Sequence, residues 1–130
     1  MTKKELDQLY NTALSYHIGK GGEEVNIMLA MDYYDEYLEN ATEKHQHFLD
    51  AHYGSADICK QMGDGCYSSG MKEEGQEWYD MALKHYDTIL VKYNNIPFDN
   101  RILAEVQYDK LRKEIEKKNK KSFLQRIFGK

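Results

Sequence analysis

MGDGCYSSGMKEEGQEWYDMAL, residues 62–83, reads as the end of one helix, a tight turn and the start of a second helix. Ser69 and Gly70 interrupt the pattern, because Gly readily adopts the left-handed backbone that ends a helix. On both sides of this turn apolar residues recur at three- and four-residue spacing, the period of a buried helix face. The stretch therefore predicts a helical hairpin, with helices over about 56–68 and 71–93.

The composition extends the helical prediction to the whole chain. The 130 residues suit one domain with a real core, and 41% of them are hydrophobic with a single Pro. Charged residues make up 31%, and clusters of Val, Ile and Thr are scarce, which favours helices over strands. We expect an all-α protein of about five helices, with antiparallel helix hairpins and a C-terminal capping helix.

The sequence predicts a cytoplasmic protein. No run approaches the roughly 20 apolar residues of a membrane span, and Met1-Thr2-Lys3-Lys4 is followed by a charged amphipathic segment rather than a signal-peptide core. Cys59 and Cys66 are seven residues apart, about 10 Å along one predicted helix, which is too far for a disulfide within it. Reduced thiols fit an intracellular setting.

Charge divides the chain into an acidic body and a basic end. Residues 1–108 hold 9 Lys and Arg against 19 Asp and Glu, a balance of −10, whereas residues 109–130 hold 9 against 3, a balance of +6. The body is expected to repel nucleic acid and anionic membranes. We divide the chain into a domain over 1–119 and a basic amphipathic tail over 120–130.

Capping residues and periodicity predict the N-terminal half. Thr2 with Glu5 forms a capping box that starts a helix over 3–18, and the glycines that follow end it. One long helix is then expected over about 23–53, with Thr42 as the best place for a break. Gly54-Ser55 would end that helix and cap the next.

The last helix is predicted to start at Asp99 or Asn100 and to end near Asn119. Its apolar spacing predicts an inward face. The residues of that face are Ile102, Leu103, Val106, Leu111 and Ile115.

The hairpin resembles a tetratricopeptide repeat, a helix pair with characteristic glycine, aromatic and alanine positions. Met62-Gly63 matches the leucine-glycine pair of the first helix, while Gly75, Tyr79 and Ala82 match the small residue, the aromatic and the alanine of the second. Glycine and small residues at this spacing let two helices approach closely, so Gly63, Tyr79 and Ala82 are expected to be structural. The chain departs from the family at Cys59, Cys66 and Asp87.

A degenerate second copy lies 45 residues upstream, where DYYDEYL (32–38) aligns with EWYDMAL (77–83). The resemblance implies a tetratricopeptide-like stack, a scaffold that holds a peptide or helix in a concave groove. It fixes no particular binding residue.

Candidate metal ligands and catalytic groups are poorly arranged in the sequence. His45, His47, His52, Asp57 and Cys59 form the densest group of potential ligands, but a shared ion would need ligands from other helices, since His47 points away from the other two histidines. The GKGG turn at 19–22 lacks the ending of a phosphate-binding loop. We therefore predict no metal, no cofactor and no catalytic residue, and a metal-dependent enzyme is the least favoured class.

Tyrosines and acidic residues mark the expected partner surface. Tyr79, Tyr86 and Tyr93 recur every seven residues on one helix. They are interpreted either as packing between helices or as the wall of a binding groove. Glu73, Glu74 and Glu77 flank them, which predicts a basic partner.

The tail adds Phe123 and Phe128 as candidate partner-binding residues. It could dock on the chain's own body or a neighbour's, engage another protein or lie on an anionic membrane, although its two turns predict no stable membrane anchoring. The favoured function is a non-enzymatic interaction module or adaptor that binds a peptide or helix, with a homodimer as one way to complete its core. The alternative is a small acidic inhibitor or immunity-type protein that blocks a basic, nucleic-acid-handling partner.

Overall fold

The computed structural model describes residues 1–128, apart from the side chains of Ser122, Phe123 and Gln125, and within that range the chain is helical without any strand. This confirms the all-α prediction and the expected five helices. A 3₁₀ turn (η1, Lys20–Gly22) follows the first helix, and a π-helical turn (η2, Thr88–Lys92) follows the fourth. The helices are α1 (Lys3–Ile18), α2 (Ile27–Asn40), α3 (Phe48–Ser68), α4 (Lys72–Asp87) and α5 (Arg101–Phe128).

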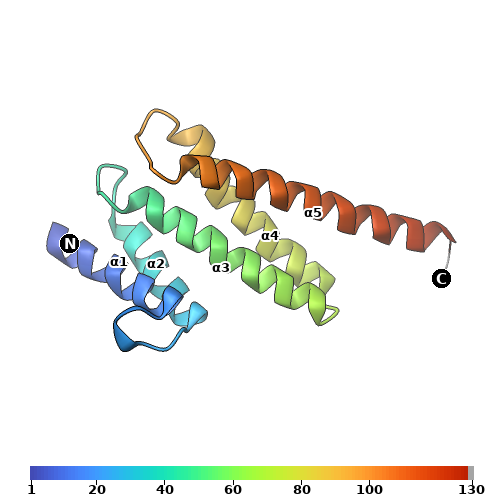
Figure 1. Ribbon diagram of the computed structural model, residues 1–130, viewed down its shortest axis with the longest axis horizontal. Coiled ribbons are helices and arrows are strands. Elements are labelled where there is room, and N and C mark those ends of the chain that lie inside the picture. The colour runs from blue at the N-terminus through green and yellow to red at the C-terminus, as the bar shows by residue number, and fades with distance from the viewer. Residues whose placement is uncertain (129–130) are drawn as a thin grey trace.

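The helices form two stacked hairpins and one added helix (Figure 1). α1 pairs with α2 and α3 pairs with α4, while α2 packs on α3 to join the two hairpins. α5 lies along α4 at the edge of the stack, and its C-terminal end reaches past the tip of the α3–α4 hairpin (Figure 1). The largest fully buried side chains include Tyr34, Tyr37, Tyr79, Tyr86, Ile58, Ile89 and Leu111.

The start of α1 is as predicted. Thr2 and Glu5 form both hydrogen bonds of the capping box, at 3.1 Å each. Gly19 ends the helix with φ 73°, the left-handed conformation that Gly adopts without a steric penalty. α2 starts later than predicted, because the side chain of Asn26 accepts a hydrogen bond from the backbone N–H of Leu29 and caps the helix there.

The predicted single helix over 23–53 is wrong. α2 ends at Asn40 and α3 begins at Phe48, so a loop replaces helix around the Thr42 position. Long-range contacts hold this loop: the His45 ring hydrogen-bonds the Tyr37 hydroxyl, and Gln46 donates to Asp7 of α1 at 3.0 Å. His45 packs inward from the loop, and Phe48 packs inward from the first residue of α3. The apolar spacing therefore looks unbroken in the sequence, although the helix is interrupted.

Gly54-Ser55 is not a helix boundary. Both residues lie buried in the middle of α3. A Cβ on Gly54 would lie 2.7 Å from Cζ of Tyr34, closer than carbon atoms pack. The glycine is therefore needed for the close approach of α2 and α3 rather than for a turn.

The α3–α4 hairpin is packed around two glycines. A Cβ on Gly63 would lie 2.5 Å from the Tyr79 ring, and one on Gly75 would lie 2.7 Å from the Tyr67 ring. Ala82 is fully buried one turn beyond Tyr79. The expected structural residues thus lie in the helix–helix interface, where small residues allow aromatic rings to fill the space between the backbones.

The inward face predicted for the last helix is only partly right. Leu111 is fully buried, but Ile102, Leu103 and Val106 are 76%, 50% and 52% exposed. Ala104 is buried instead, so the first turns of the helix present the side opposite to the predicted one, whereas Leu111 and Ile115 lie on the inward side as predicted. The helix also continues to Phe128 instead of ending near 119, so residues 120–128 are part of α5.

Arg101 fixes where α5 begins. Its guanidinium donates to the backbone carbonyls of Ile89, Tyr93 and Ile96 at 2.7, 2.6 and 2.7 Å. These carbonyls belong to the end of the α4–η2 segment and to the loop after it. The last carbonyls of a helix have no backbone N–H donor within the helix, so the Arg101 side chain supplies donors for them. One side chain thereby ties α5 to the preceding element.

Replacing Arg101 with Met should lower the free energy of unfolding by about 2–3 kcal/mol, because three partly buried carbonyls lose charge-assisted hydrogen bonds. Urea denaturation of both proteins measures this difference. Arg112→Met is the matched control: Arg112 is exposed on the same helix and only lies over the Tyr108 ring, so its loss should cost less than about 1 kcal/mol. Equal effects of the two substitutions would contradict the role of Arg101.

Candidate partner-binding groove

The predicted tyrosine stripe is mostly core. Tyr79 and Tyr86 are 0% and 1% exposed, so the interpretation of these two as a groove wall for a partner is wrong. Tyr93 is half-buried with its ring 5.3 Å from that of Phe48. Burial raises the pKa of the Tyr79 and Tyr86 phenols, and the Tyr79 hydroxyl donates to Asp64. Packing, the other interpretation, accounts for this stripe.

The predicted acidic residues do lie on the surface. Glu73, Glu74 and Glu77 are exposed on the first two turns of α4. Asp80 and Asp87 continue the exposed carboxylates along the same helix. We call these five residues the α4 acidic face.

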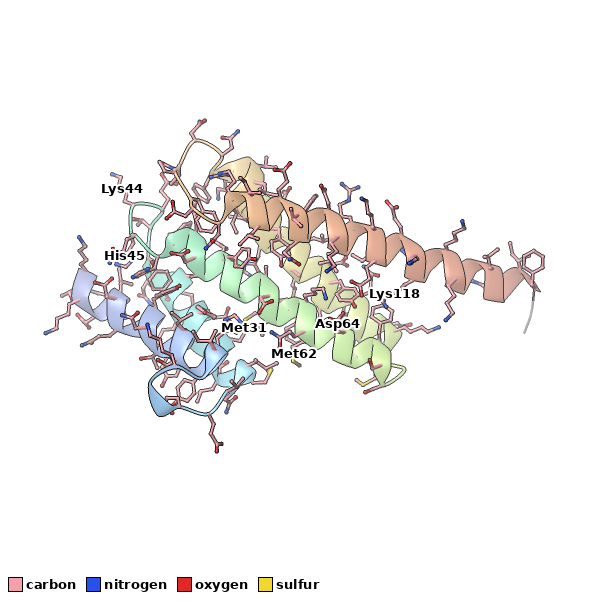
Figure 2. All side chains as sticks on the ribbon, in the orientation of Figure 1. Met31, Lys44, His45, Met62, Asp64 and Lys118 are labelled. Atoms are coloured by element: carbon pink, nitrogen blue, oxygen red, sulfur yellow. The ribbon has the colours of Figure 1, made fainter. Side chains whose placement is uncertain are left out.

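A groove of about 770 Å³ opens where α5 leaves the tip of the α3–α4 hairpin. Asp64 and Lys118, from α3 and α5, face each other across it (Figure 2). Among the predicted partner-binding residues whose side chains the structure describes, only Glu73 lines this groove, and the side chain of Phe123 lies outside that described set. The lining residues are Asp64, Tyr67, Ser68, Lys72, Glu73, Gln76, Glu114, Lys118, Asn119 and Lys121.

An ion-pair network includes Asp64 and Glu114 of the groove lining, and we call this network the floor of the groove, although Lys60 within it is not itself a lining residue. Lys60 Nζ lies 2.9 Å from Asp64 Oδ2 and 3.9 Å from Glu114 Oε2, so it bridges α3 and α5. Burial alone would lower the pKa of Lys60, but the hydrogen bond to Asp64 and the two negative charges raise it. Lys118 Nζ lies 3.9 Å from Glu114 and 4.8 Å from the centre of the Tyr67 ring. The floor is therefore internally satisfied and holds α5 at its angle to the hairpin.

The rim of the groove presents charges that are available to a partner. Lys72, Glu73 and Lys121 are exposed, and none of them forms an ion pair with another of the described residues. Tyr67 is held in the wall by a 3.1 Å hydrogen bond to Gln76. The groove thus offers an aromatic wall and charges of both signs, which suits a peptide or helix better than a small apolar molecule.

Of the five candidate metal ligands, His45 and His47 lie together beside Asp7, and the other three lie elsewhere. His45 Nε2 lies 3.1 Å from Asp7, and the His47 ring stacks on that of Tyr10. His52 Nδ1 lies 3.0 Å from Nδ1 of His85. No group of three or more His, Cys, Asp or Glu in the described part of the chain is arranged to hold a metal ion.

The remaining two candidates are Asp57 and Cys59. Asp57 accepts a hydrogen bond from His17 at 2.7 Å, which together with the His17 charge lowers the pKa of Asp57. Cys59 is fully buried, and burial raises the pKa of its thiol to about 12. A thiol with that pKa is not a nucleophile near neutral pH.

Sequence reasoning missed the α5 side of the groove. Glu114 and Lys118 stand four residues apart, as do Lys60 and Asp64, and each spacing is a signal for a helical ion pair. No local pattern could show that the two pairs meet, because they are more than 50 residues apart in the chain.

Within residues 1–128, none of the helices combines the length and apolarity that crossing a membrane requires. No protein-family model matches this chain, and no curated protein or solved structure is significantly similar to it.

Proposed function

We propose that this protein is a non-enzymatic interaction module that holds a peptide or helix of a partner protein in the groove between the α3–α4 hairpin and α5. The observation that carries the proposal is the groove itself: about 770 Å³, with a floor of paired charges and a rim of unpaired ones. The two stacked hairpins support the tetratricopeptide-like interpretation of the scaffold. The two free cysteines support a reducing, cytoplasmic location.

The rim charges define the chemistry of the expected partner. Glu73 continues into the α4 acidic face, which favours Lys or Arg on the partner segment. Lys72 and Lys121 lie at the same groove and favour an acidic side chain beside those basic residues. A predominantly basic segment with one acidic position fits this arrangement.

Reversing Glu73 at the rim together with Glu74 and Glu77, its neighbours on the α4 acidic face, should abolish partner capture. The protein is immobilised and used to retain partners from an extract of its native cell, with Glu73→Lys/Glu74→Lys/Glu77→Lys compared with the parent. The matched control reverses Glu36, Glu39 and Glu43, which are also exposed but lie far along the chain from the groove. We expect the first variant to lose the partner and the control to retain it. Both variants have the same net charge, so a difference between them reports the position of the reversed charges and not the total charge of the protein.

A second pair of variants tests the groove without changing charge. Ser68 lines the groove and Ser69 does not, although both are exposed. Ser68→Trp should fill the groove and block capture, whereas Ser69→Trp should not. Retention of the partner by both Ser68→Trp and the triple Glu variant would refute the proposed site.

The α4 acidic face favours the second candidate, an inhibitor or immunity-type protein. Five exposed carboxylates on one helix suit a basic surface of a nucleic-acid-handling enzyme. In this case the captured protein would be an enzyme whose activity falls when the complex forms. The triple Glu variant would relieve that inhibition, but Ser68→Trp would not.

A further inference from the structure

The outer side of α5 carries one continuous exposed stripe. Its positions recur every three or four residues, so they share one face of the helix. The stripe begins and ends with apolar residues and has four lysines between them. We call it the α5 outer stripe, and its members, all exposed, are Ile102, Val106, Lys110, Lys113, Lys117, Lys120, Leu124 and Phe128.

This stripe is a surface that the rest of the protein does not use. The opposite side of α5, with Ala104 and Leu111 fully buried, packs toward α4, so the stripe faces away from the stack. It extends over about 39 Å, from 26 residues at 1.5 Å each. Ile102 is 76% exposed and Phe128 is 75% exposed, which is unfavourable in water for large apolar side chains.

We propose that the α5 outer stripe docks reversibly on an anionic lipid surface. The four lysines match negatively charged headgroups, each with a favourable interaction near such a surface. The apolar ends match the boundary between headgroups and acyl chains, where a helix lying in the plane of the membrane buries its apolar side chains. This function goes beyond partner binding in the groove and does not depend on it.

The tail sequence alone predicted only two helical turns, whereas the structure provides a long, preformed helix that can lie on a membrane. A two-turn amphipathic tail would have to fold on the membrane, but residues 120–128 continue a 28-residue helix that is already formed against α4. The apolar contacts are also distributed over both ends of the stripe instead of being confined to the tail. The result is adsorption along the helix, not insertion.

The acidic body does not prevent this contact. Residues 1–108 carry the excess of acidic residues, and those of α1 to α4 lie on the side of α5 that packs against the stack, opposite the stripe. A helix with its side chains is about 10 Å across, and the Debye length at physiological salt is about 8 Å. Most of the body's charge is thus screened from a surface that touches the stripe. Asp109 and Glu116 border the stripe on one side only.

A second copy of the chain fits the stripe poorly. Lysines and apolar residues are arranged symmetrically about Ile115, so an antiparallel pair of stripes would place Lys110 on Lys120 and Lys113 on Lys117. A parallel pair would place each lysine on itself. Both arrangements bring like charges together, which destabilises the pair. Nucleic acid would engage the lysines but would leave the aliphatic Ile102, Val106 and Leu124 in water.

Vesicle co-sedimentation of the full chain tests the proposal. We expect binding to vesicles of phosphatidylcholine with phosphatidylserine, little binding to phosphatidylcholine alone, and loss of binding at high salt. Lys113→Glu/Lys117→Glu should weaken binding to the mixed vesicles by at least about tenfold. Lys3→Glu/Lys4→Glu, which reverses two exposed lysines on α1, should leave it within about twofold.

A second variant tests the apolar ends without changing charge. Ile102→Ser/Phe128→Ser removes the two most exposed apolar members of the stripe and should also weaken vesicle binding while circular dichroism stays unchanged. Three results would overturn the proposal: no binding of the folded protein to anionic vesicles, equal weakening by the Lys3/Lys4 variant, or binding to single-stranded DNA or a second copy through these lysines without vesicle binding. Ser68→Trp should leave vesicle binding unchanged, so failure of the groove proposal is distinguishable from failure of this one.

Discussion

Gly63→Leu is expected to prevent the α3–α4 hairpin from closing and to leave the chain largely unfolded at room temperature. Even a single Cβ at this position would lie 2.5 Å from the Tyr79 ring and 3.1 Å from the backbone carbonyl of Gly75. The Tyr79 ring is fully buried, so it could move only by displacing the side chains packed around it. Overpacking of a core costs about 1–3 kcal/mol or more, and here a backbone shift between two helices would be required as well.

Circular dichroism and urea denaturation measure this effect, and Gly65 supplies a matched control. Gly65 lies in the same helix two residues later, but a Cβ there would meet nothing within 4 Å. Gly65→Ala should therefore stabilise the protein by about 0.5–1 kcal/mol, because Ala has the higher helix propensity. Gly63→Ala should destabilise it. A folded Gly63→Leu protein with unchanged stability would show that the helix interface does not depend on this glycine.

Acidification from pH 6.5 to pH 4 is expected to destabilise the fold by about 3 kcal/mol through the half-buried pair of His52 and His85. Burial, with smaller contributions from the charges of His85 and Lys92, lowers the pKa of His52 from 6.5 to about 4. Burial also lowers the pKa of His85. Below pH 6.5 the unfolded chain therefore binds protons that the folded chain does not bind. The free energy of unfolding consequently falls as the pH falls from 6.5 to 4, by about 1.4 kcal/mol per pH unit for His52.

Thermal denaturation at a series of pH values measures this dependence. Asp50 acts in the opposite direction, because burial raises the pKa of its carboxyl, so comparison with a variant is needed. His52→Gln/His85→Gln keeps hydrogen-bonding side chains but removes both titrating groups, and its melting temperature should fall much less between pH 6.5 and pH 4. The slope should persist at high salt, since desolvation rather than surface charge causes it. A parent protein with the same melting temperature at both pH values would contradict this account.

Local features of the fold could be predicted from the sequence, but the candidate groove could not. Thr2 with Glu5 and the Gly19 cap could be predicted because every atom they need lies within one turn. The packing of Gly63 against Tyr79 was implied by the resemblance to a tetratricopeptide repeat, which has a glycine and an aromatic residue at these two positions. The groove could not, since its floor is made by Lys60, Asp64 and Glu114, which meet only when α5 lies beside α3.

The errors share one physical cause. Apolar spacing shows that a residue is buried but not what buries it. His45 and Gly54 fit a continuous helix pattern, yet one lies in a loop fixed by Tyr37 and Asp7, and the other permits contact with Tyr34. At the start of the last helix the large apolar residue types suggested the wrong face, because the small residue Ala104 is the one that is buried there and Ile102 is exposed.

The all-α class, the helix start at Thr2 and the basic composition of the C-terminal segment follow from the amino-acid sequence, because each depends on local backbone chemistry or on residue composition. Tertiary structure alone decided that Tyr79 and Tyr86 are core, that α5 and the hairpin tip enclose a groove, and that lysines and apolar residues of α5 form one outward stripe. These depend on the rotation and angle of packed helices, which are set by contacts between residues far apart in the chain.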